Sequence, residues 1–196
     1  FVMDENFLLY KARAMELLEQ MKEKHKAWSL YVFSSANALK KYSMRELVEL
    51  GISWVWMGLE SPESQYTKLD GTDTLVLHDT DFHQFMLYTP VPGTPLYDEM
   101  LDQGRLLADV NLADIHGQDH FNFQHAAIPR EESRRLLDWA FRLDYERNGP
   151  SVYRLAKTML EGWKKYRFDP DPRVRERVRE AGHGLRGGYG AALFAM

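Results

Sequence analysis

Apolar residues recur at two different spacings in residues 1–60, and these spacings predict both helices and strands. Between residues 10 and 21, apolar side chains return every three or four positions with charges between them, which is typical of an amphipathic helix. Residues 28–33 and 52–59 are instead short apolar runs rich in aromatic and β-branched side chains, which favour strands. Residues 1–3 form a third such run. The order is strand, helix, strand, helix, strand.

A short motif marks the second helix of this series. Ser43 and Glu46 have the spacing of a capping box, in which each side chain bonds the backbone N–H of the other residue. Gly51 follows the last apolar positions and predicts the end of the helix. The flanking strands are nearly all apolar rather than alternating, which is typical of parallel strands covered by helices. Residues 1–60 therefore predict an α/β layer built from βαβ units.

The alternation of strands and helices breaks after residue 69. Only residues 74–77 are apolar before the next strand-like run at 82–88, although a parallel crossover takes a dozen or more residues, usually as a helix. One interpretation is a simple loop. The other is that an internal βα unit of about 30 residues is missing near 74–77. The apolar start at Phe1 likewise leads us to expect further residues upstream.

Helical patterns dominate the second half of the chain. Residues 96–107 predict a short helix, and Phe121 and Phe123 alternate as in a short strand within an irregular stretch. Proline favours the first position of a helix. Three further helices are therefore predicted, beginning at Pro129, Pro150 and Pro172.

Composition and charge exclude several classes of protein. The 196 residues are 44% hydrophobic and 28% charged, as in ordinary globular proteins, and no apolar run reaches the roughly 18 residues of a transmembrane helix. Cysteine is absent, so the chain has no disulfide and no thiolate ligand for a metal. Without a secretion signal or disulfides, we expect a cytoplasmic location. The net charge of -4 argues against nucleic acid as a partner.

One segment departs from this acidic balance. Residues 163–190 carry eight basic against four acidic side chains. Such a segment either contacts RNA or a membrane surface, or forms a solvated helix with Arg–Glu pairs. We expect the solvated helix, because aromatic residues do not alternate with the arginines as a base-stacking surface requires.

Polar residues follow each predicted strand. Ligands of α/β proteins bind beyond the carboxyl ends of the strands, which share one edge of the sheet when the strands are parallel. Each cluster alone is typical of a helix cap or a turn. Together on one edge they indicate a site for a polar ligand that carries hydroxyls and an ammonium or carboxylate group. The clusters are Asp4-Glu5-Asn6, Ser34-Ser35-Ala36-Asn37, Glu60-Ser61 and the proline–glycine turn that contains Pro92, Gly93 and Thr94.

Three histidines near two aspartates are a candidate metal site. His116 and His120 have the His-x-x-x-His spacing that binds zinc on a helix, and His125 follows. The stretch, which includes Asp114 and Asp119, has no helical periodicity and lacks an HExxH motif. We therefore expect surface or hydrogen-bonded histidines and assign no metal ligand.

Three segments carry a resemblance to a known family. Residues 1–7 (FVMDENF) resemble the second-strand signature of radical SAM proteins, and residues 54–61 (WVWMGLES) are similar to their fourth-strand signature. Residues 85–97 (FMLYTPVPGTPLY) resemble the sixth strand and its exit loop. The Asp-Glu-Asn-Phe and Pro-Val-Pro-Gly-Thr patterns resemble the branch that carries a cobalamin-binding domain upstream. Residues 127–166 are similar to that branch's extension after the barrel.

The resemblance implies a fold and a chemistry. The fold is an α/β partial (β/α) barrel of radical SAM type over residues 1–108, followed by a mostly helical C-terminal extension over 109–196. The family holds a [4Fe–4S] cluster with three cysteines and cleaves S-adenosylmethionine to a radical that attacks an unactivated carbon. Thiolates ligate such clusters, so this cysteine-free chain departs from the family. Either the cluster-binding segment lies outside these residues, or the chain is a non-catalytic binding or scaffold module.

The resemblance also suggests which residues meet the cofactor, while no catalytic residue is assigned. Glu60 and Ser61 match positions that face the ribose and methionine ends, and a carboxylate there accepts strong hydrogen bonds from ribose hydroxyls. The implied partners are a small-molecule substrate and an electron donor such as flavodoxin or ferredoxin. The resemblance also allows cobalamin as a further cofactor. The remaining matched positions are Asp4, Glu5 and Asn6 for the methionine amino group, and Pro92, Gly93 and Thr94 for the adenine.

Overall fold

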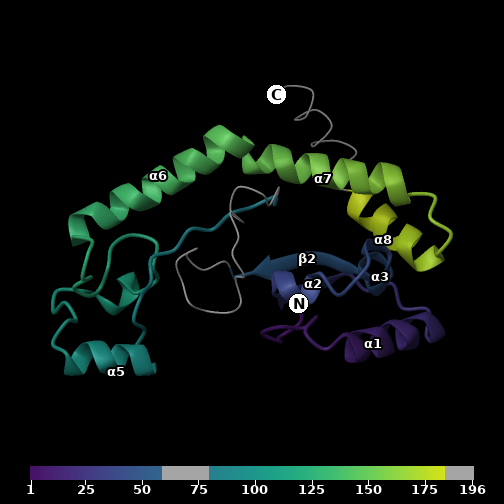
Figure 1. Cartoon of the computed structure of the whole chain (residues 1–196). Coiled ribbons are helices and arrows are strands. Elements are labelled where there is room, and N and C mark those ends of the chain that lie inside the picture. The colour runs from purple at the N-terminus through teal and green to yellow at the C-terminus, as the bar shows by residue number, and fades with distance from the viewer. Residues whose placement is uncertain (59–79, 184–196) are drawn as a thin grey trace. The chain divides into compact units, whose positions relative to one another are not determined.

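The structure is a computed structural model that describes residues 1–58 and 80–183 (Figure 1). The chain divides into two compact units. Unit 1 comprises Phe1–Asp79 and Leu155–Met196, and unit 2 comprises Thr80–Arg154. The boundary falls within helix α7 (Ser151–Tyr166).

Unit 1 contains a parallel pair of strands with helices packed against it. Strand β1 pairs with β2 from Leu30↔Ile52 to Ser34↔Met57, with a register shift after Leu30. This pairing confirms that the strands predicted at 28–33 and 52–59 are parallel neighbours. Helix α3 contacts β2, α1 and α8. The elements are α1 (Lys11–Glu23), β1 (Leu30–Ser34), α2 (Ala36–Leu39), α3 (Met44–Leu50), β2 (Ile52–Met57), most of α7, and α8 (Pro172–His183).

The core of unit 1 lies on one face of this sheet. Val32 points into it from β1, and Leu18 and Met21 of α1 are almost completely buried beside it. Leu50 closes the core from the end of α3. These are the apolar positions whose spacing predicts the helices and strands, so burial of a continuous apolar face accounts for the local structure.

The predicted capping box of α3 is confirmed. The Ser43 side chain accepts a hydrogen bond from the Glu46 backbone N–H, and the Glu46 carboxylate accepts one from the Ser43 N–H. Gly51 ends the helix in the left-handed conformation with φ 84°. A Cβ atom at Gly51 would clash with the carbonyl oxygen of Trp28, so only glycine fits this turn.

The prediction of a strand over residues 1–3 is wrong. Two backbone hydrogen bonds, Val2 N–H to Tyr31 O at 2.9 Å and Phe7 N–H to Phe33 O at 3.0 Å, hold this segment alongside β1 in a parallel sense. A regular ladder does not form because the chain turns at residues 5–8, which include Phe7.

Helix α8 is not the solvated helix that its charge pattern predicts. Arg173 and Arg177 are only 5% and 7% exposed. The Arg177 guanidinium donates to the Val48 carbonyl at 2.6 Å and the Glu49 carbonyl at 3.3 Å, at the carboxyl end of α3. Burial lowers the pKa of Arg177. Arg177 therefore fastens α8 to α3 by satisfying helix-end carbonyls, whereas Arg173 pairs with Asp171 at 2.6 Å.

Unit 2 has its own, smaller core. Met100, Phe121 and Phe123 are buried together, and an antiparallel bridge joins Leu106 to Phe123. Helix α5 ends before the predicted residue 107, because the chain turns back and Arg105 N–H bonds the Met100 carbonyl. The elements are α5 (Pro95–Asp102), a short 3₁₀ helix η1 (Leu112–Asp114), α6 (Arg130–Asn148) and the first turn of α7.

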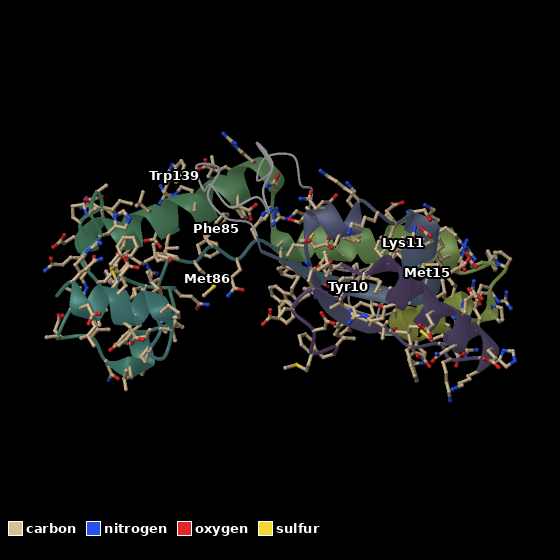
Figure 2. The ribbon with its side chains drawn as sticks, turned by 60° about the horizontal axis from the view of Figure 1, so that its bottom comes forward. Tyr10, Lys11, Met15, Phe85, Met86 and Trp139 are labelled. Carbon is tan, nitrogen blue, oxygen red and sulfur yellow. The ribbon has the colours of Figure 1, made fainter. Side chains whose placement is uncertain are left out.

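The prediction of a strand over residues 82–88 is also wrong. No strand is assigned to residues 82–88, although a backbone hydrogen bond joins Leu87 N–H to the Gly117 carbonyl at 2.7 Å. The segment is instead held by side chains: Phe85 meets Phe141 of α6 edge-on at 5.1 Å between ring centres. Figure 2 shows Phe85 beside α6, which carries Trp139. Apolar residues in this segment thus reflect packing against a helix rather than a sheet ladder.

Some larger predictions stay predictions. The described residues contain one two-stranded sheet, and the barrel stays a prediction. The domain boundary after residue 108 likewise stays a prediction. The segment 74–77, considered as the place of a missing unit, lies outside the described residues. Among residues 1–58 and 80–183, none of the helices has the length and apolar character needed to cross a membrane.

Candidate functional site

A cluster of polar side chains forms at the carboxyl end of β1. Asn6 lies at its centre, because the Ser34 hydroxyl donates to Asn6 Oδ1 at 3.1 Å and Asn6 Nδ2 donates to Ser35 Oγ at 3.2 Å. Ser34 is the last residue of β1, and Ser35 caps helix α2 by accepting from the Ala38 N–H. The structure therefore brings together two of the predicted clusters, the one around Asn6 and the one at Ser34 and Ser35.

The loop that carries Asn6 is fixed by Asp4 and Arg13. Asp4 Oδ1 accepts from the Asn6 backbone N–H at 2.9 Å, which closes a tight Asx turn. Arg13 from α1 donates to Asp4 Oδ2 at 2.7 Å and to the Phe7 carbonyl at 3.0 Å. Glu5 is exposed between these anchored residues. Helix α1, the loop and β1 thus position the cluster jointly.

The electrostatics of the cluster favour an ionised Asp4. The Asn6 backbone N–H, helped by Arg13, holds the pKa of the Asp4 carboxyl below its ordinary value. Both Asp4 oxygens already accept hydrogen bonds, so an incoming ammonium group has to share them with Arg13. Asp4 therefore orients the loop. Ser34 is buried and its hydroxyl donates to Asn6, so the neutral donors and acceptors nearest to solvent belong to the partly buried Asn6 and Ser35.

The face of the sheet opposite the core is aromatic, which the sequence analysis missed. The strand register places Tyr31 opposite Trp54 and Phe33 opposite Trp56. Ring centres lie 6.5 Å apart for Tyr31 and Trp54, and 6.0 Å apart for Trp54 and Trp56. Phe1 meets Phe33 edge-on at 5.4 Å. The signal was present in the alternation of aromatic residues at every second position of both strands.

This aromatic face stays accessible within unit 1. Tyr31 is 49% exposed, and Phe33 and Trp56 are exposed to a similar degree. The rings are inclined to one another, Tyr31 and Trp54 by 61° and Trp54 and Trp56 by 46°. An exposed aromatic face next to polar groups suits a ligand that has both a ring and hydrogen-bonding groups.

Two predicted site residues fall outside what the structure describes. Glu60 and Ser61 come three and four positions after β2 ends at Met57, and both belong to residues 59–79. Their approach to the cofactor stays a prediction.

The proline–glycine turn is well defined inside unit 2. Thr94 N–H bonds the Val91 carbonyl at 3.1 Å, and Thr94 Oγ1 caps α5 by accepting from the Tyr97 N–H. Gly93 has φ 85°, a conformation that favours glycine, and a Cβ there would meet no atom within 4 Å. Pro92 stands between Val91 and Gly93 in the turn. Because these residues belong to unit 2 and Asp4 to unit 1, their convergence stays a prediction.

The histidines each have a local partner. His125 Nδ1 accepts from the backbone N–H groups of Ala127 and Ile128, and His116 Nδ1 accepts from the Gln118 N–H. His120 pairs with Asp119 at 2.9 Å. Within the described ranges, no three His, Cys, Asp or Glu side chains are grouped so that they could hold a metal ion.

The residues fit the three implied cofactors unequally. A [4Fe–4S] cluster does not fit this chain, because its thiolate ligands are absent from all 196 residues. The hydroxyls, amide and ionised carboxylate around Asn6 do suit the polar ends of S-adenosylmethionine. No residue set described in the structure suggests a cobalamin site.

Comparisons with known proteins gave no match: no family model, no curated protein and no solved structure matches the chain. The family resemblance therefore rests on the sequence motifs alone.

Proposed function

We propose that this chain is part of a radical SAM enzyme and binds S-adenosylmethionine at the carboxyl end of its parallel strands. The observation that carries the proposal is the Asn6 side chain, which joins Ser34 and Ser35 at the edge where ligands of α/β proteins bind. The sequence motifs led us to expect polar groups at this edge. Ser34 and Ser35 both form hydrogen bonds with the Asn6 side chain there.

The chemistry of the ligand matches the surroundings of the cluster. The methionine end of the ligand carries an ammonium and a carboxylate, which suit the Asn6 amide and the serine hydroxyls. The aromatic face formed by Tyr31, Phe33, Trp54 and Trp56 offers planar area for an adenine ring. In this proposal Glu60 accepts hydrogen bonds from the ribose hydroxyls.

These residues bind and orient; they do not generate the radical. An iron–sulfur cluster would supply the reductive cleavage of S-adenosylmethionine, and the residues around Asn6 would hold and orient that ligand. The cluster's ligands have to come from a cysteine-bearing segment other than these residues, and cobalamin and an electron donor such as flavodoxin or ferredoxin remain part of the same proposal. The reaction class is methylation, cyclisation or another rearrangement.

Calorimetric titration of the 196-residue chain with S-adenosylmethionine tests the proposal. We expect saturable binding that Asn6→Ala weakens about tenfold, a loss of roughly 1.4 kcal/mol. Gln20→Ala is the control, because Gln20 is an exposed amide side chain on helix α1 that belongs to none of the candidate clusters. Circular dichroism verifies that both variants fold. No heat of binding at millimolar ligand, or equal affinity of the two variants, would refute the proposed site.

One observation favours a second function: the complete absence of cysteine suits a binding or scaffold module on a barrel without a cluster. The two functions differ in what the full-length gene encodes. A Cys-x-x-x-Cys-x-x-Cys segment in the same gene supports the enzyme, and its absence supports the module. Glu60→Ala lowers the affinity for S-adenosylmethionine under the enzyme proposal, and unchanged affinity by calorimetry argues against that role.

A further inference from the structure

Unit 2 contains a buried histidine whose two ring nitrogens are both engaged. His83 Nδ1 lies 2.7 Å from Asp144 Oδ1, and His83 Nε2 lies 2.7 Å from the Thr80 hydroxyl. The side chains of His83 and Asp144 are only 6% and 9% exposed. Thr80 is half-buried, so its hydroxyl lies at the border between this network and solvent.

Asp144 is held from the other side by residues near the start of α7. The Arg154 guanidinium donates to both carboxylate oxygens, at 2.9 and 3.0 Å, and Asn148 Nδ2 donates to Oδ1 at 2.7 Å. Arg154 also donates to Ser151 Oγ at 3.0 Å. Burial by itself would raise the pKa of Asp144, but the bonds from Arg154, Asn148 and His83 outweigh it and lower the pKa. Asp144 is therefore an ionised group that only accepts.

The acceptor character of Asp144 decides how the histidine ring is protonated. His83 Nδ1 has to donate to the carboxylate, and Arg154 already neutralises the charge of Asp144. A neutral ring with its proton on Nδ1 carries a lone pair on Nε2. With the ring in that form, the Thr80 hydroxyl donates to Nε2 across the 2.7 Å contact. Hydroxyl, imidazole and carboxylate stand in the order of a nucleophile, its base and the group that orients the base.

We propose that Thr80 is an activated hydroxyl that accepts an acyl group from activated esters. As Thr80 Oγ1 attacks the ester carbonyl, its proton moves to His83 Nε2. The bond from the carbonyl carbon to the leaving oxygen then breaks, and His83 returns the proton to that oxygen, so the products are the Thr80 ester and an alcohol. Asp144 is a positioning residue in this step. The proposal is independent of S-adenosylmethionine binding, since it uses residues of unit 2 alone.

Treatment of the complete 196-residue chain with p-nitrophenyl acetate tests this assignment. We expect release of p-nitrophenol and one acetyl group on Thr80, located by peptide mass spectrometry. Thr80→Val is expected to abolish this acetylation and His83→Gln to slow it at least tenfold. Thr89→Val is the matched control, because the Thr89 hydroxyl bonds the Leu87 carbonyl rather than a histidine.

Two outcomes overturn the proposal. One is folded wild-type chain in which Thr80 is acetylated no faster than Thr89 of the same molecule, a comparison that needs no variant. The other is a His83→Gln chain, folded by circular dichroism, whose Thr80 is acetylated at the wild-type rate. Thr80→Ser keeps the hydroxyl and is expected to retain the acetylation, which separates loss of the nucleophile from loss of structure.

Discussion

The two units bury different kinds of side chain. Unit 1 is organised around apolar residues of α1, α3 and β1, among which Leu18, Met21, Val32 and Leu50 are almost completely enclosed. Unit 2 has a small aromatic core, and at its other end Asp144 collects buried hydrogen bonds from His83, Asn148 and Arg154. One unit therefore depends mainly on apolar packing, and the other depends strongly on a polar network.

The difference matters because the two kinds of interior respond differently to substitution. An apolar core loses stability in proportion to the volume that is removed. Removing one partner of a buried ion pair destabilises the fold strongly, because the remaining charge is buried without a counter-charge. Substitutions of matched residues in the two units therefore test the comparison directly.

The largest effect is expected from breaking the ion pair of unit 2. Arg154→Met leaves the Asp144 carboxylate without its cation, and we expect a loss of about 3–5 kcal/mol in the free energy of unfolding. Arg142→Met, an exposed arginine on α6, is expected to change it by less than about 0.5 kcal/mol. Urea denaturation followed by circular dichroism measures both values. Equal values for the two variants would contradict the importance of the network.

A comparable or slightly smaller effect is expected from the core of unit 1. Met21→Ala removes a side chain that is 1% exposed, and we expect a cost of about 2–5 kcal/mol. Met44→Ala makes the same chemical change at a position that is 64% exposed, and we expect less than about 0.5 kcal/mol. Urea titration of each variant gives the comparison. If Met44→Ala lowers the free energy of unfolding and Met21→Ala leaves it unchanged, the burial of α1 against the core is contradicted.

The capping box of α3 gives a smaller expected change. Ser43→Ala removes the acceptor for the Glu46 backbone N–H and the hydroxyl that bonds its carboxylate at 2.9 Å. We expect a loss of about 1 kcal/mol, the usual value for an N-cap residue. Thermal unfolding measures it, and Ser43→Asp, which can also cap, is expected to recover most of the loss. If Ser43→Ala unfolds at the same temperature as the wild-type chain, Ser43 is not the N-cap of α3.

The smallest predicted effect is a loss of the stability of unit 1 at acidic pH. The Lys11 ammonium, together with Ser43, lowers the pKa of Glu46 to about 2 from an ordinary 4.5. A carboxyl whose pKa is depressed by folding adds stability above its unfolded pKa and loses it as the pH falls. The melting temperature should therefore fall between pH 4.5 and pH 2, and less steeply in Glu46→Gln. Glu16→Gln, at an exposed site on α1, serves as control; identical slopes for the two variants would count against the Glu46 contacts.

The sequence predicted unit 1 better than unit 2 for a physical reason. The capping box, Gly51 and the strands at 28–33 and 52–59 are local signals, and the structure confirms them with small shifts of the ends. The apolar run at 82–88 has the composition of a strand but packs on α6, a contact that depends on residues far away in the chain.

The same limit applies to the candidate site. Polar residues at the ends of strands indicated Asn6, Ser34 and Ser35, and their hydrogen bonds could not be read from spacing alone. The pairing of His83 with Asp144 joins positions 61 residues apart, so no local pattern reveals it. The burial of Arg177 could not be predicted for a similar reason. Its charge suggests a surface position, but it bonds backbone carbonyls of α3, which is far away in the sequence.

The most direct test of the proposed site is to follow the backbone amide signals of the isotope-labelled chain by nuclear magnetic resonance during titration with S-adenosylmethionine. The account predicts concentration-dependent shifts centred on Asn6, Ser34 and Ser35, together with Trp56 on the aromatic face. Spectra that do not change, or shifts confined to residues 80–154, would contradict it.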